Sequence, residues 1–166
     1  SCIYVCSDLH GEYPVYKAMI NQLKETDKLY ILGDVIDRGP DGIKILQDVM
    51  KRKEKGQVEF LIGNHELMMI QALFLDNTKA KQNWIRNDGN ITLEEFEKLN
   101  YSDQIEIREF LLDSYVYKNI EVNSQNVHLV HARAIQDENN NSDKTLREMI
   151  NEGEFNLIEE ALWDRA

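Results

Sequence analysis

The sequence predicts an α/β fold. Three short apolar segments in the first 75 residues are each followed by a segment whose apolar residues have helical spacing. This alternation is typical of parallel strands joined by helices through right-handed crossovers. A chain of 166 residues can bury one hydrophobic core, and no linker or internal repeat divides the sequence. We therefore expect one domain that spans residues 1–166.

The first half of the chain supplies the parallel part of this fold. Runs of apolar residues predict strands over 3–7, 28–32 and 58–62. Helical spacing predicts helices over 14–24, from Asp41 (a possible N-terminal cap) to about residue 50, and over 67–75. Each predicted strand therefore leads into a helix.

The second half has a different character. Residues 76–113 are polar and predict a helical insert, with N-cap signatures at Thr92 and at Ser102 or Asp103. Two apolar segments, 115–122 and 126–132, flank Asn-Ser-Gln and predict a β-hairpin. We expect a polar loop over 136–144 and a helix over 145–162.

Composition excludes several classes of partner. Thirty acidic and 19 basic residues give a net charge of −11, which disfavours a nucleic-acid partner. No apolar run reaches the roughly 20 residues of a membrane span, and the N-terminus has no signal-peptide pattern. Cys2 and Cys6 lie four residues apart in an extended segment, which is too far for a disulfide. We expect a cytoplasmic protein without a membrane partner, and the sequence leaves its oligomeric state open.

Polar side chains follow four predicted strands at the point where each strand ends. Ligands of open α/β sheets gather beyond the carboxyl ends of the strands, so these side chains are expected to converge. Singly, an aspartate there is more often a turn residue, and a histidine such as His128 is more often structural. Four such strand ends in one chain instead favour a shared site. Its candidate members are Asp8, His10, Asp34, Asn64, His65 and His131.

The donor types indicate a metal site. Carboxylate, imidazole and amide oxygen together suit manganese, iron, zinc or magnesium, and no thiolate belongs to the set. These residues are too many for one ion. Two metal ions about 3.5–4 Å apart, bridged by one carboxylate, form an arrangement used to hydrolyse phosphate esters.

Three sequence blocks carry a resemblance to a known family. "SDLHG" (7–11), "GDVIDRG" (33–39) and "GNHE" (63–66) resemble the signature blocks of the calcineurin-like metallophosphoesterases. Their spacing and the "DRG" are most similar to the phosphoprotein phosphatase branch, which contains bacterial Ser/Thr protein phosphatases and diadenosine tetraphosphate hydrolases. "VHA" (130–132) and "LWDR" (162–165) resemble later blocks of that branch. The implied fold is a metallophosphoesterase-type β-sandwich flanked by helices, in four layers α/β/β/α.

The resemblance also implies metal ligands. Asp8 and His10 would hold one metal ion, Asp34 would bridge both, and Asn64 and His131 would hold the second. Manganese is the metal expected, with iron, zinc or magnesium as alternatives. A hydroxide held between the two ions would attack phosphorus in line.

Further roles follow from the same resemblance. His65 would be the general acid, and Asp37 would orient its imidazole. Arg38 and Arg165 would bind phosphoryl oxygens together with Asn64. A surface salt bridge is the alternative for each arginine. Within the insert, Arg86 or Asn87 could approach the site, although helices that only cover the core are the simpler expectation.

Three positions depart from the pattern of the branch. Ile62 stands where eukaryotic-type protein phosphatases carry an arginine, and this favours a bacterial-type enzyme. Arg133 follows "VHA" where many relatives have glycine, and it has no assigned role. The branch has a later Gly-His-Thr block whose histidine binds the second metal, but only Ala166 follows Arg165. We expect either a C-terminally truncated domain or a second metal site with fewer ligands.

These observations predict a metal-dependent phosphoesterase acting on phosphomonoesters, with a Ser/Thr protein phosphatase as the leading hypothesis. The substrate would be a phosphoprotein, or a phosphorylated small molecule or nucleotide. One alternative is a symmetrical bis(5'-nucleosyl)-tetraphosphate hydrolase. An alternative of another class is a truncated, catalytically weak domain that binds metal or a partner.

Overall fold

The computed structural model describes residues 1–75, 77–131 and 143–153. Strands and helices alternate through the first three strands, after which four helices precede a long hairpin. In chain order the elements are β1 (Ile3–Cys6), α1 (Tyr13–Gln22), β2 (Lys28–Leu32), α2 (Gly42–Glu54), β3 (Val58–Leu61), α3 (Asn64–Phe74), α4 (Thr78–Arg86), α5 (Asn90–Glu97), α6 (Tyr101–Leu112), β4 (Tyr115–Val122), β5 (Gln125–Val130), β6 (Lys144–Thr145) and α7 (Leu146–Asn151).

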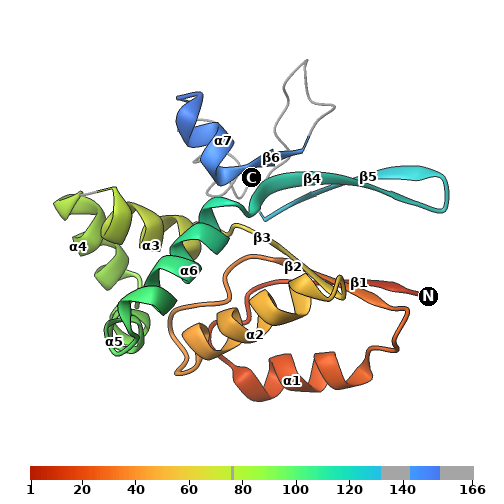
Figure 1. The fold of residues 1–166 in the computed structure, drawn as a ribbon, viewed down its shortest axis with the longest axis horizontal. Helices are drawn as coiled ribbons and strands as arrows, with labels where there is room; N and C mark the ends of the chain where they lie inside the picture. The colour runs from red at the N-terminus through yellow and green to blue at the C-terminus, as the bar shows by residue number, and fades with distance from the viewer. Residues whose placement is uncertain (76, 132–142, 154–166) are drawn as a thin grey trace.

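The described strands form one six-stranded sheet. Its order is β1-β2-β3-β4-β5, with β6 paired to β4. β1 to β4 run parallel, whereas β4 pairs antiparallel with both β5 and β6. Helices connect each parallel pair, so the carboxyl ends of β1, β2 and β3 lie at one edge of the sheet (Figure 1).

The two faces of the sheet bury different sets of side chains. α1 and α2 cover one face of β1–β3, while α7 lies on the other side of the sheet (Figure 1). Leu29 and Ile31 belong to the main core, and their neighbour Tyr30 packs with Leu61 and Leu129 in a separate small cluster. This separation follows from the two-residue period of a strand, which sends successive side chains to opposite faces.

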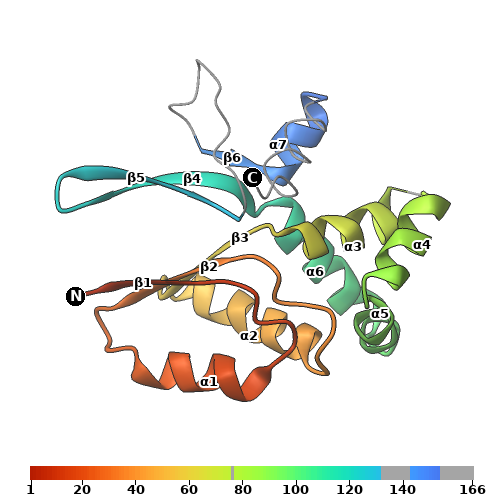
Figure 2. The ribbon, with the colours of Figure 1, turned by 180° about the vertical axis from the view of Figure 1, so that it is seen from behind.

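Helices α3 to α6 gather at the end of the molecule away from the N-terminus and the hairpin tip (Figure 2). α3 and α4 pack against each other, and α6 runs back to the start of β4. Trp84 of α4 and Phe96 of α5 are buried within this group. The helices therefore approach the edge at which the parallel strands end.

The predicted α/β class is confirmed, and the predicted strands agree with the structure to within a residue at each end of β1–β3. The two-residue turn of the hairpin, Asn123-Ser124, has φ of 51° and 63°, as a tight hairpin turn requires. The predicted sandwich has two sheets, whereas the described residues form a single six-stranded sheet. Of the predicted helix over 145–162, the described residues include α7 alone.

The starts of three helices were predicted wrongly. α5 begins at Asn90 after its N-cap Gly89, so Thr92 lies inside the helix and not at its cap. α6 begins at Tyr101, and its N-cap is Asn100 in place of Ser102 or Asp103.

The third helix begins at Asn64, not at Leu67. The buried carboxylate of Glu66 accepts the N–H of Gly63 at 2.9 Å and so caps the helix three residues earlier. As a result Asn64 and His65 lie in the first helical turn. Among the described residues, no helix has the length and apolar content needed to cross a membrane.

Candidate active site

The loops that follow β1 and β2 continue the pairing of the strands. The N–H of Asp8 donates to the carbonyl of Gly33 at 3.2 Å, and the N–H of His10 donates to that of Asp34 at 2.9 Å. Two strand exits are thereby held together by their backbones. Their side chains project from a fixed scaffold, which is what a geometrically exact site needs.

Five of the predicted site residues have backbones in the left-handed region. These are Asp8, His10, Asp34, Asp37 and Arg38, with φ between 41° and 73°. Residues with a Cβ enter this region at a cost of roughly 1–2 kcal/mol each. Such outliers are often found at functional sites. The strain therefore coincides with the chemistry that the sequence predicts.

Asp8, Asp34 and His131 form the first cluster of metal-ligating side chains. Each offers one ligand atom, and these atoms lie within 4.8 Å of one another. Nε2 of His131 is 2.9 Å from Oδ2 of Asp34. Nδ1 of the same ring hydrogen-bonds the carbonyl of Leu32. This bond fixes the ring so that Nε2 is the nitrogen directed at the site.

His10, Asp34 and His65 form the second such cluster, again within 4.8 Å. Nδ1 of His10 donates to the carbonyl of Ile36 at 2.9 Å, which leaves Nε2 for a ligand. The rings of His10 and His65 meet edge to face, with centroids 4.8 Å apart. Asp34 belongs to both clusters, as a bridging carboxylate must.

Asn64 supports the fit of a metal ion by its burial. Its side chain is 1% exposed, and neither Oδ1 nor Nδ2 has a hydrogen-bond partner among the described residues. A buried amide without partners costs about 1–3 kcal/mol. Coordination of a cation by Oδ1 would compensate part of this cost. The oxygen and imidazole donors around it suit a divalent ion.

The charges of Asp34 and His131 are coupled. Burial would raise the pKa of Asp34, but the hydrogen bond and charge of His131 outweigh it and lower this pKa below its ordinary value. Burial lowers the pKa of His131, and the contact with Asp34 overcomes this and raises it to about 9. A cation held by both side chains would therefore replace the proton of His131.

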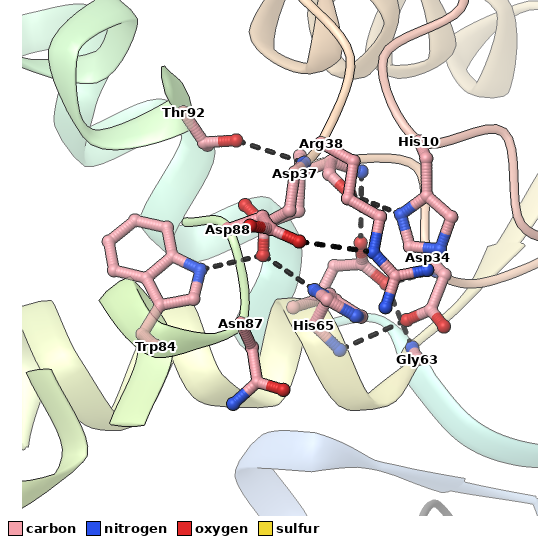
Figure 3. A network of polar contacts seen from close by, with 12 residues as sticks. His10, Asp34, Asp37, Arg38, Gly63, His65, Trp84, Asn87, Asp88 and Thr92 are labelled. Carbon is pink, nitrogen blue, oxygen red and sulfur yellow. Dashed lines mark hydrogen bonds and ion pairs between the residues drawn. The ribbon is translucent and has the colours of Figure 1, made fainter. Parts of the chain in front are cut away.

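His65 and Asp37 form a buried pair beside these clusters (Figure 3). Nδ1 of His65 lies 2.7 Å from Oδ2 of Asp37. Burial lowers the pKa of His65, but the bond from Asp37 and the charge of Asp34 raise it overall. With Nδ1 engaged, Nε2 is the nitrogen that can give up a proton. The same Nε2 could instead bind a metal, because His65 also belongs to the second cluster.

Glu66 holds the loops around the site from beneath. Its fully buried carboxylate accepts the N–H of Asp34 at 2.7 Å and that of Val35 at 3.0 Å, besides that of Gly63. It therefore ties the exit of β2 to the exit of β3. The sequence points to Glu66 as part of the "GNHE" block, but its contacts to the first loop cannot be read from one segment.

Residues of the helical segment for which the sequence predicts no role at the site also reach it. Trp84 and Thr92 both hydrogen-bond Asp37, and Asp88 lies beside Arg38 (Figure 3). The one signal in the sequence is a tryptophan inside a polar stretch. The sequence suggests Arg86 or Asn87 for this role, whereas the contacts come from Trp84, Asp88 and Thr92. The amide of Asn87 donates to the carbonyl of Asn83 at 2.7 Å.

The two predicted phosphate-binding arginines have different outcomes. Arg38 is half-exposed, and its Nε lies 3.6 Å from Oδ2 of Asp88, so both the ion pair and access to a ligand are available. Arg165 and Arg133 lie outside the described residues. His128 meets Asn119 across the hairpin at 2.7 Å and lies in neither cluster.

Comparison with known proteins agrees with this site. The family model described as calcineurin-like phosphoesterase matches residues 3–164. Serine/threonine-protein phosphatase 2 of Escherichia coli (strain K12) is 31% identical over 136 residues, which cover 80% of this chain and 57% of that protein. The symmetrical bis(5'-nucleosyl)-tetraphosphatase of Erwinia tasmaniensis is 29% identical over 115 residues, which cover 58% of this chain and 41% of that protein. The chain thus spans about two fifths to three fifths of the length of these curated relatives.

Proposed function

The chain belongs to the calcineurin-like phosphoesterase family, and on this basis we propose that it hydrolyses phosphomonoesters with the help of two divalent metal ions. The observation that carries the proposal is the pair of ligand clusters that share Asp34. A single cluster of ligand-type side chains would be weak support, because such clusters also occur without this function. Two clusters with a common carboxylate match the two-metal arrangement used for phosphate ester hydrolysis.

Asp8, Asp34 and His131 of the first cluster and His10 of the second would hold these ions together with Asn64, while His65 of the second cluster would serve as the acid. When bound, the ions lower the pKa of water and polarise the phosphoryl oxygens. The chain contributes the fixed orientation of each donor, because carbonyl groups hold Nδ1 of His10 and of His131. Manganese is our choice of metal, because the mixed oxygen and imidazole set suits it.

His65 would act on the leaving group. Its Nε2 donates a proton to the departing alkoxide, while Asp37 holds Nδ1 and stabilises the charged ring. Burial lowers the pKa of His65, but the contacts with Asp37 and Asp34 raise it overall, which favours the protonated ring that a general acid needs.

Arg38 would bind the phosphoryl group by its planar guanidinium. It is exposed enough to exchange its ion pair with Asp88 for a bidentate contact with the substrate. Arg165 would add a second such contact, and Asn64 would contact the phosphoryl group beside the metal.

For the substrate we propose phosphoserine or phosphothreonine in a protein. The support is the longer match to the E. coli protein named a serine/threonine phosphatase. Similarity to a protein named a symmetrical bis(5'-nucleosyl)-tetraphosphatase supports dinucleoside tetraphosphates as the second candidate. We place the reaction in the cytoplasm, on the basis of the two free cysteines.

The test is turnover by the purified chain with Mn²⁺. We expect hydrolysis of p-nitrophenyl phosphate and of a phosphothreonine peptide, and slower hydrolysis of diadenosine tetraphosphate. Faster cleavage of the dinucleotide would make dinucleoside tetraphosphates the leading substrate candidate in place of phosphoproteins. If the chain binds two metal ions and hydrolyses none of these compounds, the function is metal or partner binding instead.

A further inference from the structure

Residues 84–92 comprise the end of α4, the turn that follows and the start of α5, and we call this segment the α4–α5 turn. It contacts the loop that carries Asp37 and Arg38. We propose that this turn positions the acid of the reaction, with Trp84 and Thr92 as positioning residues that hold Asp37 against His65. The inference rests on the proposed phosphoesterase function and adds to it a device from outside the three signature-like blocks. Neither residue touches substrate; both act through Asp37.

Trp84 directs the carboxylate of Asp37. Its side chain is fully buried, and Nε1 donates to Oδ2 of Asp37 at 2.8 Å. That oxygen is the one that meets Nδ1 of His65 at 2.7 Å (Figure 3). Oδ1 of Asp37 is buried and has no hydrogen-bond partner among the described residues. The indole N–H is therefore what keeps Oδ2 turned toward the imidazole.

Thr92 holds the backbone beneath that carboxylate. Its hydroxyl oxygen accepts the N–H of Asp37 at 3.0 Å, and its side chain is 2% exposed. Asp37 and Arg38 have φ of 73° and 72°, so two successive residues with side chains are strained. The N–H of Arg38 donates to the carbonyl of Asp88 at 3.2 Å. The turn thus stabilises a backbone conformation that the loop would leave by itself.

Gly89 makes room for the indole. A Cβ at this position would lie 2.5 Å from Cδ1 and from Nε1 of Trp84, well inside contact distance. The N–H of Gly89 also donates to the carbonyl of Trp84 at 3.0 Å. The position of the Trp84 indole therefore depends on the absence of a side chain at Gly89.

Because the bonds of Trp84 and Thr92 end on Asp37, their loss should differ in effect from the loss of an ordinary core contact. A tryptophan that only fills space would act on all substrates alike, through stability. A tryptophan that aligns Asp37 acts on the one step that needs His65, which is protonation of the leaving group. Its loss must then slow esters with poor leaving groups more than esters with good ones.

The decisive experiment compares phenyl phosphate with p-nitrophenyl phosphate at saturating Mn²⁺. Trp84→Phe keeps the ring and removes the indole N–H. We expect kcat for phenyl phosphate to fall about tenfold to a hundredfold, part of the roughly 10²–10⁴ that a general acid supplies, with KM and metal content unchanged. For p-nitrophenyl phosphate we expect a loss under about threefold. Equal losses on both esters, or no loss, would overturn the proposal.

Two further variants and one control sharpen the result. Thr92→Val should give the same leaving-group pattern, and Thr92→Ser, which retains the hydroxyl, should restore it to wild type. Tyr16→Phe is the matched control, because it removes a part-buried hydrogen bond of 2.6 Å to Asp48 between α1 and α2. It should lower stability and leave the ratio of the two rates unchanged. A shift of that ratio in the control would show that any core defect produces the pattern.

A readout without turnover separates this inference from the proposed function. The indole N–H resonance of Trp84 is identified by its absence in Trp84→Phe. It should exchange slowly with solvent, and it should exchange at least about tenfold faster when Asp37→Ala removes its charged acceptor. Asp37→Asn, which keeps the size, should shift the resonance if the alanine variant does not fold. An inactive wild type would end the proposed function, whereas an unchanged resonance in both variants would end the Trp84 contact.

Discussion

The strand ends of the first 66 residues and the helices of residues 77–113 serve the candidate active site in different ways. The strand ends supply ligand-type side chains, each from a short loop directly after a strand, and His131 joins them from the end of β5. Of the helical segment, the described residues supply no member of either ligand cluster. They supply bonds to Asp37 that span 47 and 55 residues of sequence.

The strand ends thus carry the proposed metal ligands, whereas the helices hold another residue, Asp37, in place. Side chains at strand ends can bind an ion only if the sheet edge is formed, and parallel pairing forms it. A strained loop such as Asp37–Arg38 keeps its shape only if something outside it supplies the bonds. The helices provide those bonds. Substitutions at the strand ends should therefore remove bound metal or a reacting group. Substitutions in the helices should instead disturb the alignment of Asp37 with His65.

The largest effect is expected from Asp34→Asn, which replaces the carboxylate that the two ligand clusters have in common. An amide cannot serve both ions as a carboxylate does, so both should be lost or weakened. We expect turnover to fall by about a thousandfold or more, since the nucleophile depends on both ions. Metal analysis after gel filtration measures the occupancy. Asp41→Asn is the control, because Asp41 lies in the following loop and makes no side-chain cap bond. Full retention of two ions by Asp34→Asn would remove the bridging role.

The next effect is expected from His65→Asn, which tests whether this residue is an acid or a ligand. As an acid, its loss should slow phenyl phosphate by roughly 10²–10⁴ and spare the metal content. The rate with p-nitrophenyl phosphate should fall much less. His128→Asn serves as the control, since His128 contacts Asn119 on the hairpin. Loss of one metal ion from His65→Asn would instead assign the residue to the second cluster.

The same contrast explains how far the sequence could be interpreted. Asp8, Asp34 and His131 could be found because each follows a strand whose apolar pattern is plain. The start of α3 was placed too late because its N-cap is Gly63, which has no capping side chain, and the carboxylate that caps it belongs to Glu66 inside the helix. The contacts of Trp84 and Thr92 with Asp37 could not be predicted, because they are determined by how α4 and α5 pack. Helical periodicity predicts a helix, but it does not predict which distant loop the helix holds.

A smaller effect is expected from Glu66→Gln, which weakens the tie between two strand exits. The amide NH₂ would face a backbone N–H that the carboxylate now accepts. Leaving such buried donors without an acceptor costs about 1–3 kcal/mol each, so we expect a loss of about 2–3 kcal/mol. Urea unfolding of the metal-free chain measures it. Glu95→Gln, which removes an exposed pair with Lys98, should change stability little. An equal stability in both variants would contradict the bracing role of Glu66.

The smallest effect is expected from Gly89→Ala, on the helical side of the comparison. The new methyl group meets the indole of Trp84 at 2.5 Å, and an overpacked site of this kind costs about 1–3 kcal/mol. The ring must shift away from Asp37, so the rate with phenyl phosphate should fall more than the rate with p-nitrophenyl phosphate. The expected pattern is that of Trp84→Phe, in a milder form, because the indole N–H is displaced and not removed.

Gly56→Ala provides the matched control for this substitution. Gly56 has φ of 78°, and the space that a methyl group would occupy there is open, so alanine introduces strain without a collision. It should lower the free energy of unfolding and leave the ratio of the two ester rates at the wild-type value. If Gly89→Ala also leaves that ratio unchanged while the chain is destabilised, the turn serves the fold alone. If Gly89→Ala changes the ratio while it destabilises the chain no more than Gly56→Ala does, the helices of residues 77–113 align the acid, although they supply no metal ligand.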